Sequence, residues 1–274
     1  MIEIERIEVD NRDALKFIIK DTFPAFVNAI RRIILLDVPT IAIEDVIMIE
    51  NTTAIFDEYI AHRLGMIPLN SEIDDLYMID ECPSCEGKGC NMCTVSLTLT
   101  QETDRNNEKM VYSRDLDPLD HRIYPIQDEI PIMKMGKDQR LILEAIARFG
   151  TGREHAKWQP VGTLVFRFMP KVKIKSNAKF NQKILESCPK QNFRVKNNKV
   201  EVNNVLDGIC EECLHNGFEE GSVEVEYDRS TIIFELESTG ALIPENIVLK
   251  ASEILDRKID AFIEEFQKVV YEET

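Results

Sequence analysis

The sequence predicts an α+β fold in which one discontinuous domain, an antiparallel sheet with helices, contains two insertions. Three observations predict it. Apolar and polar residues alternate near both ends of the chain, over Ile2–Ile19 and Val223–Leu236. Helical patterns follow each of these segments, and short strand-like segments separated by polar turns occupy the middle. Alternation of this kind is typical of half-buried strands, and its presence at both ends indicates one sheet built from both ends.

The first alternating segment predicts a β-hairpin. Ile2–Val9 forms one strand, Asp10–Asp13 supplies the turn, and Leu15–Ile19 returns.

The segment Pro24–Leu36 predicts an apolar helix, which Pro39 ends. Apolar residues cover most of its circumference, and its only charges are Arg31 and Arg32. A helix that is apolar nearly all round is either buried or shared with another chain. We therefore expect an interface here, in which at least one arginine reaches a carboxylate or carbonyl of a partner. The alternative is a pair of surface cations.

The middle of the chain predicts a mainly β domain. Thr40–Ile49 alternates as a strand, and a short helix runs from Asp57 to Gly65. Further strand-like segments follow at Thr94–Thr100, Lys109–Tyr112 and Leu164–Phe168.

Near the C-terminus we expect a second hairpin and a long helix. The hairpin has strands at Val223–Tyr227 and Thr231–Leu236 with a turn at Asp228–Ser230. After Pro244 an amphipathic helix continues to about Tyr271, and would be roughly 40 Å long. Because that exceeds what one small domain needs, a partner helix is expected; the alternative is a helix that packs only on its own sheet.

These patterns give domain boundaries and an interface. The discontinuous domain is expected over residues 1–47 and 221–274, the mainly β domain over 48–170, and a small insert over 171–220. The interface is expected on the apolar faces of the first and last helices, at Phe26, Ile30, Arg31, Arg32, Ile33, Ile254, Ile259, Phe262 and Phe266.

Composition limits the function classes. The formal net charge of −16 over 274 residues argues against direct binding of nucleic acid phosphates. No run approaches eighteen apolar residues and the N-terminus is acidic, so we expect a cytoplasmic protein with no membrane contact. In such a compartment, seven cysteines mostly in Cys-x-x-Cys pairs favour metal binding over disulfides.

Four cysteines lie in one loop, at Cys82, Cys85, Cys90 and Cys93. Their spacing suits a single tetrahedral zinc, which holds a loop closed without redox chemistry. Two disulfides or four free thiols are the alternatives.

A second, incomplete set consists of Cys188, Cys210 and Cys213. Their order resembles half of a two-cluster bacterial ferredoxin, but Asn216 and Glu220 stand where its remaining cysteines would be. A four-iron cluster would lack a ligand, whereas a 3Fe-4S cluster or no cluster stays open. We favour a ferredoxin-like insert without a cluster; an iron-sulfur electron-transfer or redox-sensing protein is the alternative function.

No catalytic site is predicted in this chain. It has no phosphate-binding glycine motif, no aspartate cluster for catalytic Mg²⁺, and its histidines are scattered. The loop from His155 to Trp158 could be functional or could be a connection anchored by the only tryptophan.

Four motifs in order now support a resemblance. They are the segment NAIRRIILLDVPTIAIEDVIMIENTTAIFDEYIAHRLGMIPL, the cysteine loop ECPSCEGKGCNMCTVSLTLTQ, EHAKWQP, and ESTGALIPENIVLKASEILDRKI. Together they resemble the D family of archaeal DNA-directed RNA polymerase subunits, which is similar to the third-largest subunit of eukaryotic RNA polymerase II and to bacterial RNA polymerase alpha.

The resemblance implies an assembly platform rather than an active site. It implies a heterodimer with subunit L through the first and last helices, followed by recruitment of subunits N and P and the second-largest subunit. The complex is a nucleotidyltransferase whose catalysis belongs to the large subunits. The resemblance also implies zinc at Cys82–Cys93 and a ferredoxin-like domain at the second cysteine set.

Overall fold

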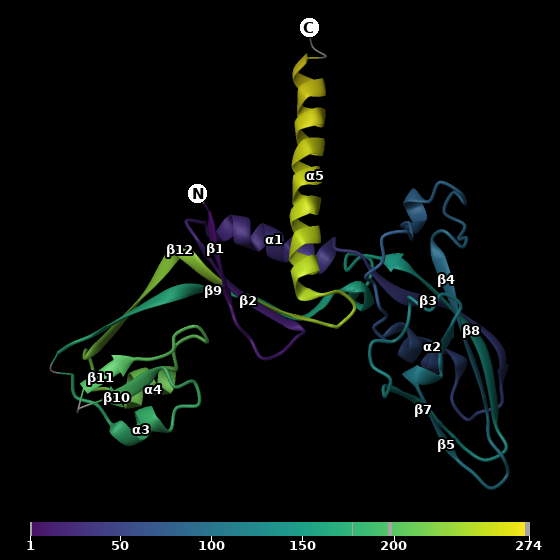
Figure 1. The fold of residues 1–274 in the computed structure, drawn as a ribbon, viewed down its shortest axis with the longest axis horizontal. Helices are drawn as coiled ribbons and strands as arrows, with labels where there is room; N and C mark the ends of the chain where they lie inside the picture. Colours follow the sequence, from purple (N-terminus) through teal and green to yellow (C-terminus); the bar gives the residue numbers. More distant parts are fainter. Residues whose placement is uncertain (1, 177, 197–198, 272–274) are drawn as a thin grey trace. The chain divides into compact units, whose positions relative to one another are not determined.

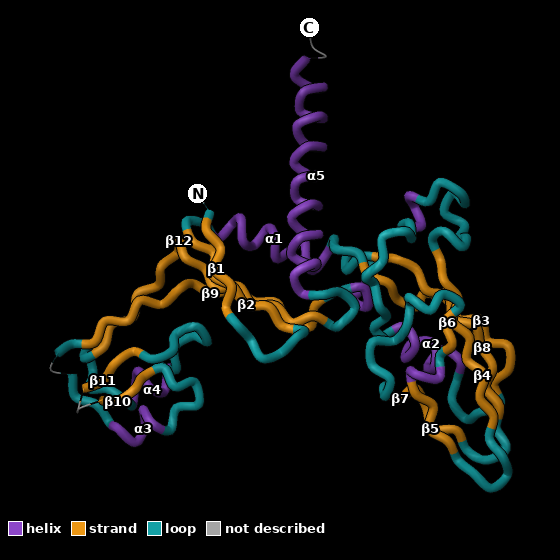
Figure 2. The backbone as a smooth tube through the Cα atoms, viewed as in Figure 1, coloured by secondary structure: helices purple, strands orange, loops and turns teal. Residues whose placement is uncertain are grey.

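The computed structural model describes residues 2–176, 178–196 and 199–271. The chain forms two compact units (Figure 1). The first comprises Met1–Asp10, Leu15–Ala29 and Leu164–Leu236, and the second comprises Asn11–Ala14, Ile30–Thr163 and Glu237–Thr274. The mixture of helices and antiparallel sheets confirms the α+β class (Figure 2).

The main sheet of the first unit has the strand order β1-β2-β12-β9. Its strands are β1 (Glu3–Ile7), β2 (Ala14–Lys20), β12 (Val223–Ser238) and β9 (Val161–Ile174). The predicted N-terminal hairpin is confirmed, because β1 and β2 pair antiparallel from Glu3↔Lys20 to Ile7↔Lys16. Phe17 and Phe234 pack with ring centroids 5.2 Å apart, so strands from both ends of the sequence share one core.

The predicted hairpin turn at Asp228–Ser230 is wrong, because β12 runs unbroken through it. The Asp228 carboxylate accepts the Ser230 N–H at 2.9 Å and pairs with Lys171 at 2.8 Å. The Ser230 carbonyl accepts the Thr22 N–H at 3.1 Å. The Asp228–Ser230 bond is of the local kind that favours a turn, but the bond from Thr22 and the position of β12 between β2 and β9 keep the chain extended.

Strand β9 also differs from expectation. Its central residues, Leu164–Phe168, were expected in the mainly β domain, but β9 pairs with β12 in the sheet of the first unit. The domain boundaries given above stay a prediction.

The small insert in the first unit contains helices α3 (Gln182–Glu186) and α4 (Glu211–Asn216) and the hairpin of β10 (Phe193–Lys196) and β11 (Lys199–Val202). A short set of buried side chains forms its core: Leu185, Cys188, Phe193, Cys213 and Phe218. Such a core is too small to stabilise much on its own, and two of its members are cysteines.

The second unit is built on a four-stranded sheet of order β3-β8-β4-β6. Its strands are β3 (Thr40–Asn51), β8 (Arg140–Gly150), β4 (Thr94–Glu102) and β6 (Asp117–Pro118). A second pair joins β5 (Lys109–Tyr112) to β7 (Pro131–Met135), and short 3-10 turns η1 (Ile79–Glu81), η2 (Ser113–Asp115) and η3 (Ala156–Trp158) lie in the connections. The mainly β character expected for this region is confirmed.

Helix α2 (Asp57–Gly65) covers one face of this sheet through buried Ile60 and Leu64. The expected extents of the first and last helices are also confirmed, as α1 covers Pro24–Leu36 and α5 covers Pro244–Tyr271. No helix within the described ranges is long and apolar enough to span a membrane.

Candidate metal centre and subunit interface

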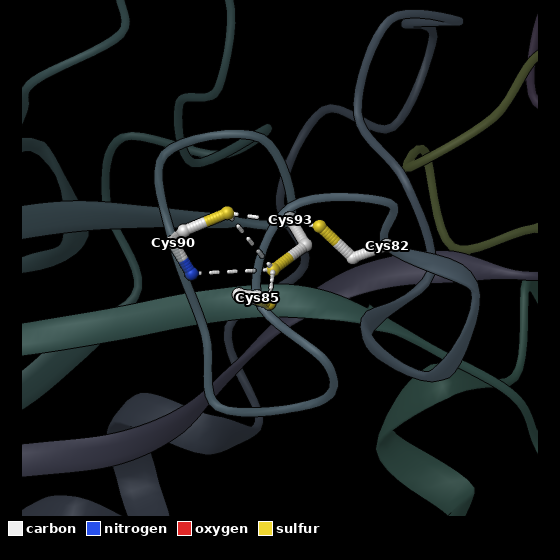
Figure 3. Close-up of side chains that lie close together, drawn as sticks. All are labelled: Cys82, Cys85, Cys90 and Cys93. Atoms are coloured by element: carbon white, nitrogen blue, oxygen red, sulfur yellow. Dashed lines mark hydrogen bonds between the residues drawn. The ribbon is translucent and has the colours of Figure 1, made fainter.

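The four-cysteine loop lies between η1 and β4. Figure 3 shows the four cysteine side chains gathered close together. The Sγ atoms of Cys82, Cys85, Cys90 and Cys93 all lie within 4.8 Å of one another. Neighbouring Sγ atoms are 3.6 Å apart for Cys82 and Cys90, and 3.5 Å apart for Cys85 and Cys93. A tetrahedral ion with Zn–S bonds of about 2.3 Å needs S···S separations of about 3.8 Å, whereas a disulfide needs about 2.05 Å. The thiols therefore fit one metal ion, and all four are free.

Local backbone geometry brings the two Cys-x-x-Cys pairs together. Gly87 and Gly89 have φ values of +83° and +86°. Glycine adopts such positive values readily because it has no Cβ, whereas other residues rarely do. At the second pair, the Cys90 carbonyl accepts the N–H of Thr94 at 2.8 Å, and the Cys90 N–H donates to the Cys93 Sγ at 3.3 Å. The loop therefore closes immediately before β4 begins.

The thiols differ in acidity. Burial raises the pKa of Cys93 to about 12. Burial also opposes ionisation of Cys85, but hydrogen bonds from Cys93, Cys82 and the N–H groups of Gly89 and Gly87 lower its pKa to about 7. The Met92 N–H lowers the pKa of Cys90. One thiolate thus forms readily in the cluster, and a bound divalent cation would favour ionisation of the others.

The second cysteine set also converges in space. The Sγ atoms of Cys188, Cys210 and Cys213 lie within 4.8 Å of one another. Asn192 fixes this arrangement, since its Oδ1 accepts the Cys210 N–H at 2.8 Å. Asn216, in one of the two places without a cysteine, bonds instead to Glu212 at 2.8 Å. The described residues therefore offer three thiols here, as expected.

Burial and the neighbouring thiols raise the pKa of Cys213 far above its usual value. Burial has the same tendency at Cys188, but hydrogen bonds from Cys213 and from the N–H groups of Asn192 and Lys190 outweigh it and lower the pKa. The three-thiol cluster could hold a metal ion.

The outer half of α5 exposes an apolar stripe. Its base is buried through Ile247, Ala251 and Ile254, whereas every described residue from Asp256 to Val270 is exposed. Phe262 is 68% exposed and stacks on Phe266 with ring centroids 6.0 Å apart. The exposed stripe, hereafter the α5 stripe, comprises Ile259, Phe262, Ile263, Phe266, Val269 and Val270.

Two predicted interface residues are not on this free surface. Ile254 and Ile33 are 8% and 6% exposed, because both pack into the chain itself. On α1, Phe26, Ile30 and Arg31 are half-buried and Arg32 is exposed. The predicted interface did not include Phe23, which is 60% exposed beside Phe26, nor did it include Ile263, Val269 and Val270 of the α5 stripe.

The base of α5 is anchored by carboxylates that sequence reasoning did not find. Glu72 accepts the Ile243 N–H at 2.6 Å and the Asn246 amide at 2.8 Å, just before and within the first turn of the helix. Asp37 pairs with Lys258 at 2.6 Å and with Arg153 at 2.7 Å. No spacing rule links residues so far apart in the sequence.

Of the two interpretations of the His155–Trp158 loop, the structure favours the anchored connection. Trp158 is 2% exposed, and its Nε1–H donates to the Arg148 carbonyl at 3.3 Å. The cations of Arg148 and Lys157 lie 4.7 and 4.3 Å from the indole ring, and both pair with Glu44. The loop therefore ties β3 to β8.

The chain is similar to known subunits of one enzyme. The family described as RNA polymerase Rpb3/RpoA insert domain matches residues 44–165. The DNA-directed RNA polymerase subunit Rpo3 of Archaeoglobus fulgidus is 37% identical over 272 residues, covering 99% of both chains. The Rpo3 proteins of Methanosphaera stadtmanae and Pyrococcus horikoshii are each 36% identical, covering 96% and 98% of this chain and 97% and 99% of their own.

This chain belongs to the Rpo3 family of DNA-directed RNA polymerase subunits. The predicted family resemblance is thereby confirmed. Rpo3 proteins are subunits of a multi-subunit polymerase, and none of these names supports the electron-transfer alternative.

Proposed function

We propose that this chain is a non-catalytic assembly subunit of DNA-directed RNA polymerase, located in the cytoplasm. The α5 stripe is the main support for this proposal. Six large apolar side chains at one end of an anchored helix are costly to leave in water, and a protein partner removes that cost. The names of the relatives make other polymerase subunits the natural partners.

The first partner is the family's subunit L, which forms a heterodimer with this chain. Its contacts involve the α5 stripe and the N-terminal end of α1, where Phe23 and Phe26 present a smaller apolar surface. Subunits N and P and the second-largest subunit then join this platform. The large subunits supply the nucleotidyltransferase site, and this chain supplies none.

A zinc ion at Cys82, Cys85, Cys90 and Cys93 is part of the proposal. Zinc there would crosslink the loop before β4 and bring no redox chemistry. For Cys188, Cys210 and Cys213 we propose a structural thiol cluster without iron, because the four-iron cluster of the ferredoxin pattern would lack its last ligand here.

Reconstitution of the polymerase from separate subunits tests the function. We expect no nucleotide incorporation by this chain alone, and template-directed incorporation only when it is included with the other subunits. Phe262→Asp should prevent assembly. The matched control is Phe56→Asp, which alters an 80% exposed phenylalanine outside α1 and α5. Full activity without the chain would refute the proposal.

A further inference from the structure

Strand β3 is at the edge of the four-stranded sheet, with β8 on one side only. In an antiparallel pair, successive residues direct their backbone N–H and C=O groups alternately toward the partner strand and away from it. The groups that point away from β8 are therefore available to other partners.

The beginning of this edge is covered. The Ile41 N–H donates to Ser71 Oγ at 2.9 Å, and the Ile43 carbonyl accepts from Lys157 Nζ at 2.9 Å. The backbone N–H and C=O groups of both residues thus point away from β8. At the other end, the backbone N–H of Thr52 points toward β8, since it donates to the Arg140 carbonyl at 3.0 Å.

The pairing register shows which residues lie between these limits. Asp45 pairs with Ile146 and Ile47 pairs with Glu144, with one bulge before Asp45 and another after Met48. The alternation can be followed from Ile43 forward or from Thr52 back, and both give the same result. The backbone N–H and C=O groups of Asp45 and Ile47 point toward β8, whereas those of Val46 and Met48 point away from it. No described residue donates to or accepts from the outward groups of Val46 and Met48.

Apart from Asp45, the residues of this short edge are apolar. The side chains of Val46 and Met48 pack on the core, while Ile47 and Ile49 are 50% and 64% exposed on the opposite face. Proteins commonly protect free edges with lysine or proline, and residues 45–49 contain neither. The two bulges restrict the regular stretch to four residues, which suits a short added strand.

Charge discriminates between two partners that could pair with this edge, a second copy of the chain and a strand from a different protein. An antiparallel pairing of two copies would bring together two chains that each have a net charge of −16. Asp45 makes no ion pair with any described residue. A heterologous strand with a basic residue near Asp45 and β-branched residues beside Ile47 suits the edge better.

We propose that Asp45–Met48 of β3 accepts an extended segment from another polymerase subunit as an added strand. This segment would have a short β-branched core flanked by lysine or arginine, and its backbone would pair with Val46 and Met48. The surface is separate from α1 and α5, so the proposal extends beyond the heterodimer.

Residue-resolved hydrogen exchange tests the proposal on the full chain and on polymerase purified through a tag on this chain. In the free chain, the amides of Val46 and Met48 should exchange quickly. In the polymerase they should slow by about 100-fold or more. The Ile47 amide bonds to β8 and should be slow in both, which makes it the internal control. Fast exchange of Val46 and Met48 in the polymerase overturns the proposal. Protection in the free chain that rises with concentration also overturns it, because it indicates a second copy.

A proline variant separates strand addition from simple burial. Val46→Pro removes an N–H that β8 does not use, whereas Val46→Ala keeps it and loses only packing. We expect polymerase purified with Val46→Pro to lose at least one subunit by about tenfold relative to Val46→Ala. Equal subunit content in the two preparations overturns strand pairing, and if Val46→Pro does not fold, the exchange experiment decides alone.

Discussion

Truncation of one side chain in the α5 stripe should weaken the heterodimer without affecting the chain's own stability. Phe262 is 68% exposed, so most of its apolar surface is available to a partner. Full burial of such a side chain contributes about 1.5–3 kcal/mol, and two thirds of that gives about 1–2 kcal/mol. Phe262→Ala should therefore raise the Kd for subunit L by about 5- to 30-fold. Isothermal titration calorimetry measures this directly.

A buried residue of the same helix gives the matched comparison. Ile247 is 0% exposed, and Ile247→Ala should lower the free energy of unfolding by about 2–5 kcal/mol. The Phe262→Ala chain should instead unfold at the wild-type denaturant midpoint. An unchanged Kd for Phe262→Ala, or a loss of stability as large as that of Ile247→Ala, would mean that the outer half of α5 is not a free surface, and the expected interface would be wrong.

Three further results are expected. Anaerobically purified chain should contain about one zinc and no iron by mass spectrometry of metals; Cys93→Ser should remove the zinc, Cys188→Ser should leave it, and about three irons per chain would contradict the assignment. Hydrogen bonds from Lys258 and Arg153 outweigh burial and lower the pKa of Asp37, so its ion pairs stabilise the fold above the ordinary carboxyl pKa and lose this effect as pH falls through the lowered value. Asp37→Asn should therefore cost about 1 kcal/mol in urea unfolding at pH 7, and the cost should disappear in acid; a pH-independent difference would be inconsistent with this. A Cβ on Gly152 would lie 1.9 Å from the Leu35 carbonyl oxygen, while one on Gly162 would meet nothing within 4 Å. Gly152→Ala should thus destabilise the chain by about 3 kcal/mol or more and Gly162→Ala by less than about 1 kcal/mol, as thermal unfolding can check; similar effects would show that the backbone yields at Gly152.

The helices were predictable because their signals are local. Pro24 and Pro39 bracket α1, and apolar residues recur at helical spacing along α5. The four-cysteine set was predictable for the same reason, since short intervals keep its members close whatever the surrounding fold is. In the second set only Cys210 and Cys213 are close in sequence, and Cys188 was grouped with them because of the ferredoxin-like order. The structure brings each set together within 4.8 Å.

The central strand of the second unit was not predictable from local signals. β8 consists largely of leucine, isoleucine, alanine and glutamate, which are compatible with a helix. Its alternation is hidden because Ile142 and Ile146 are apolar although they are on the less buried face. Pairing with β3 and β4 on both sides determines the strand, and those partners are distant in the sequence.

The interface stays a prediction, but the structure shows which residues of the apolar faces the chain itself covers. Ile254 and Phe262 occupy the same kind of position in the helical pattern, yet one packs into the chain and the other is exposed. The difference arises because the rest of the second unit buries one side of α5 only as far as Ile254. The carboxylates of Glu72 and Asp37 anchor the helix base, and only the folded chain brings them there.

The mass of the complex formed with subunit L tests whether the chain forms the heterodimer that we propose for the α5 stripe. Size-exclusion chromatography with light scattering, at micromolar concentrations of this chain and the purified L homologue, should give a single peak with the mass of a 1:1 heterodimer. Two separate peaks, each with the mass of one free subunit, would show that the stripe does not bind this partner.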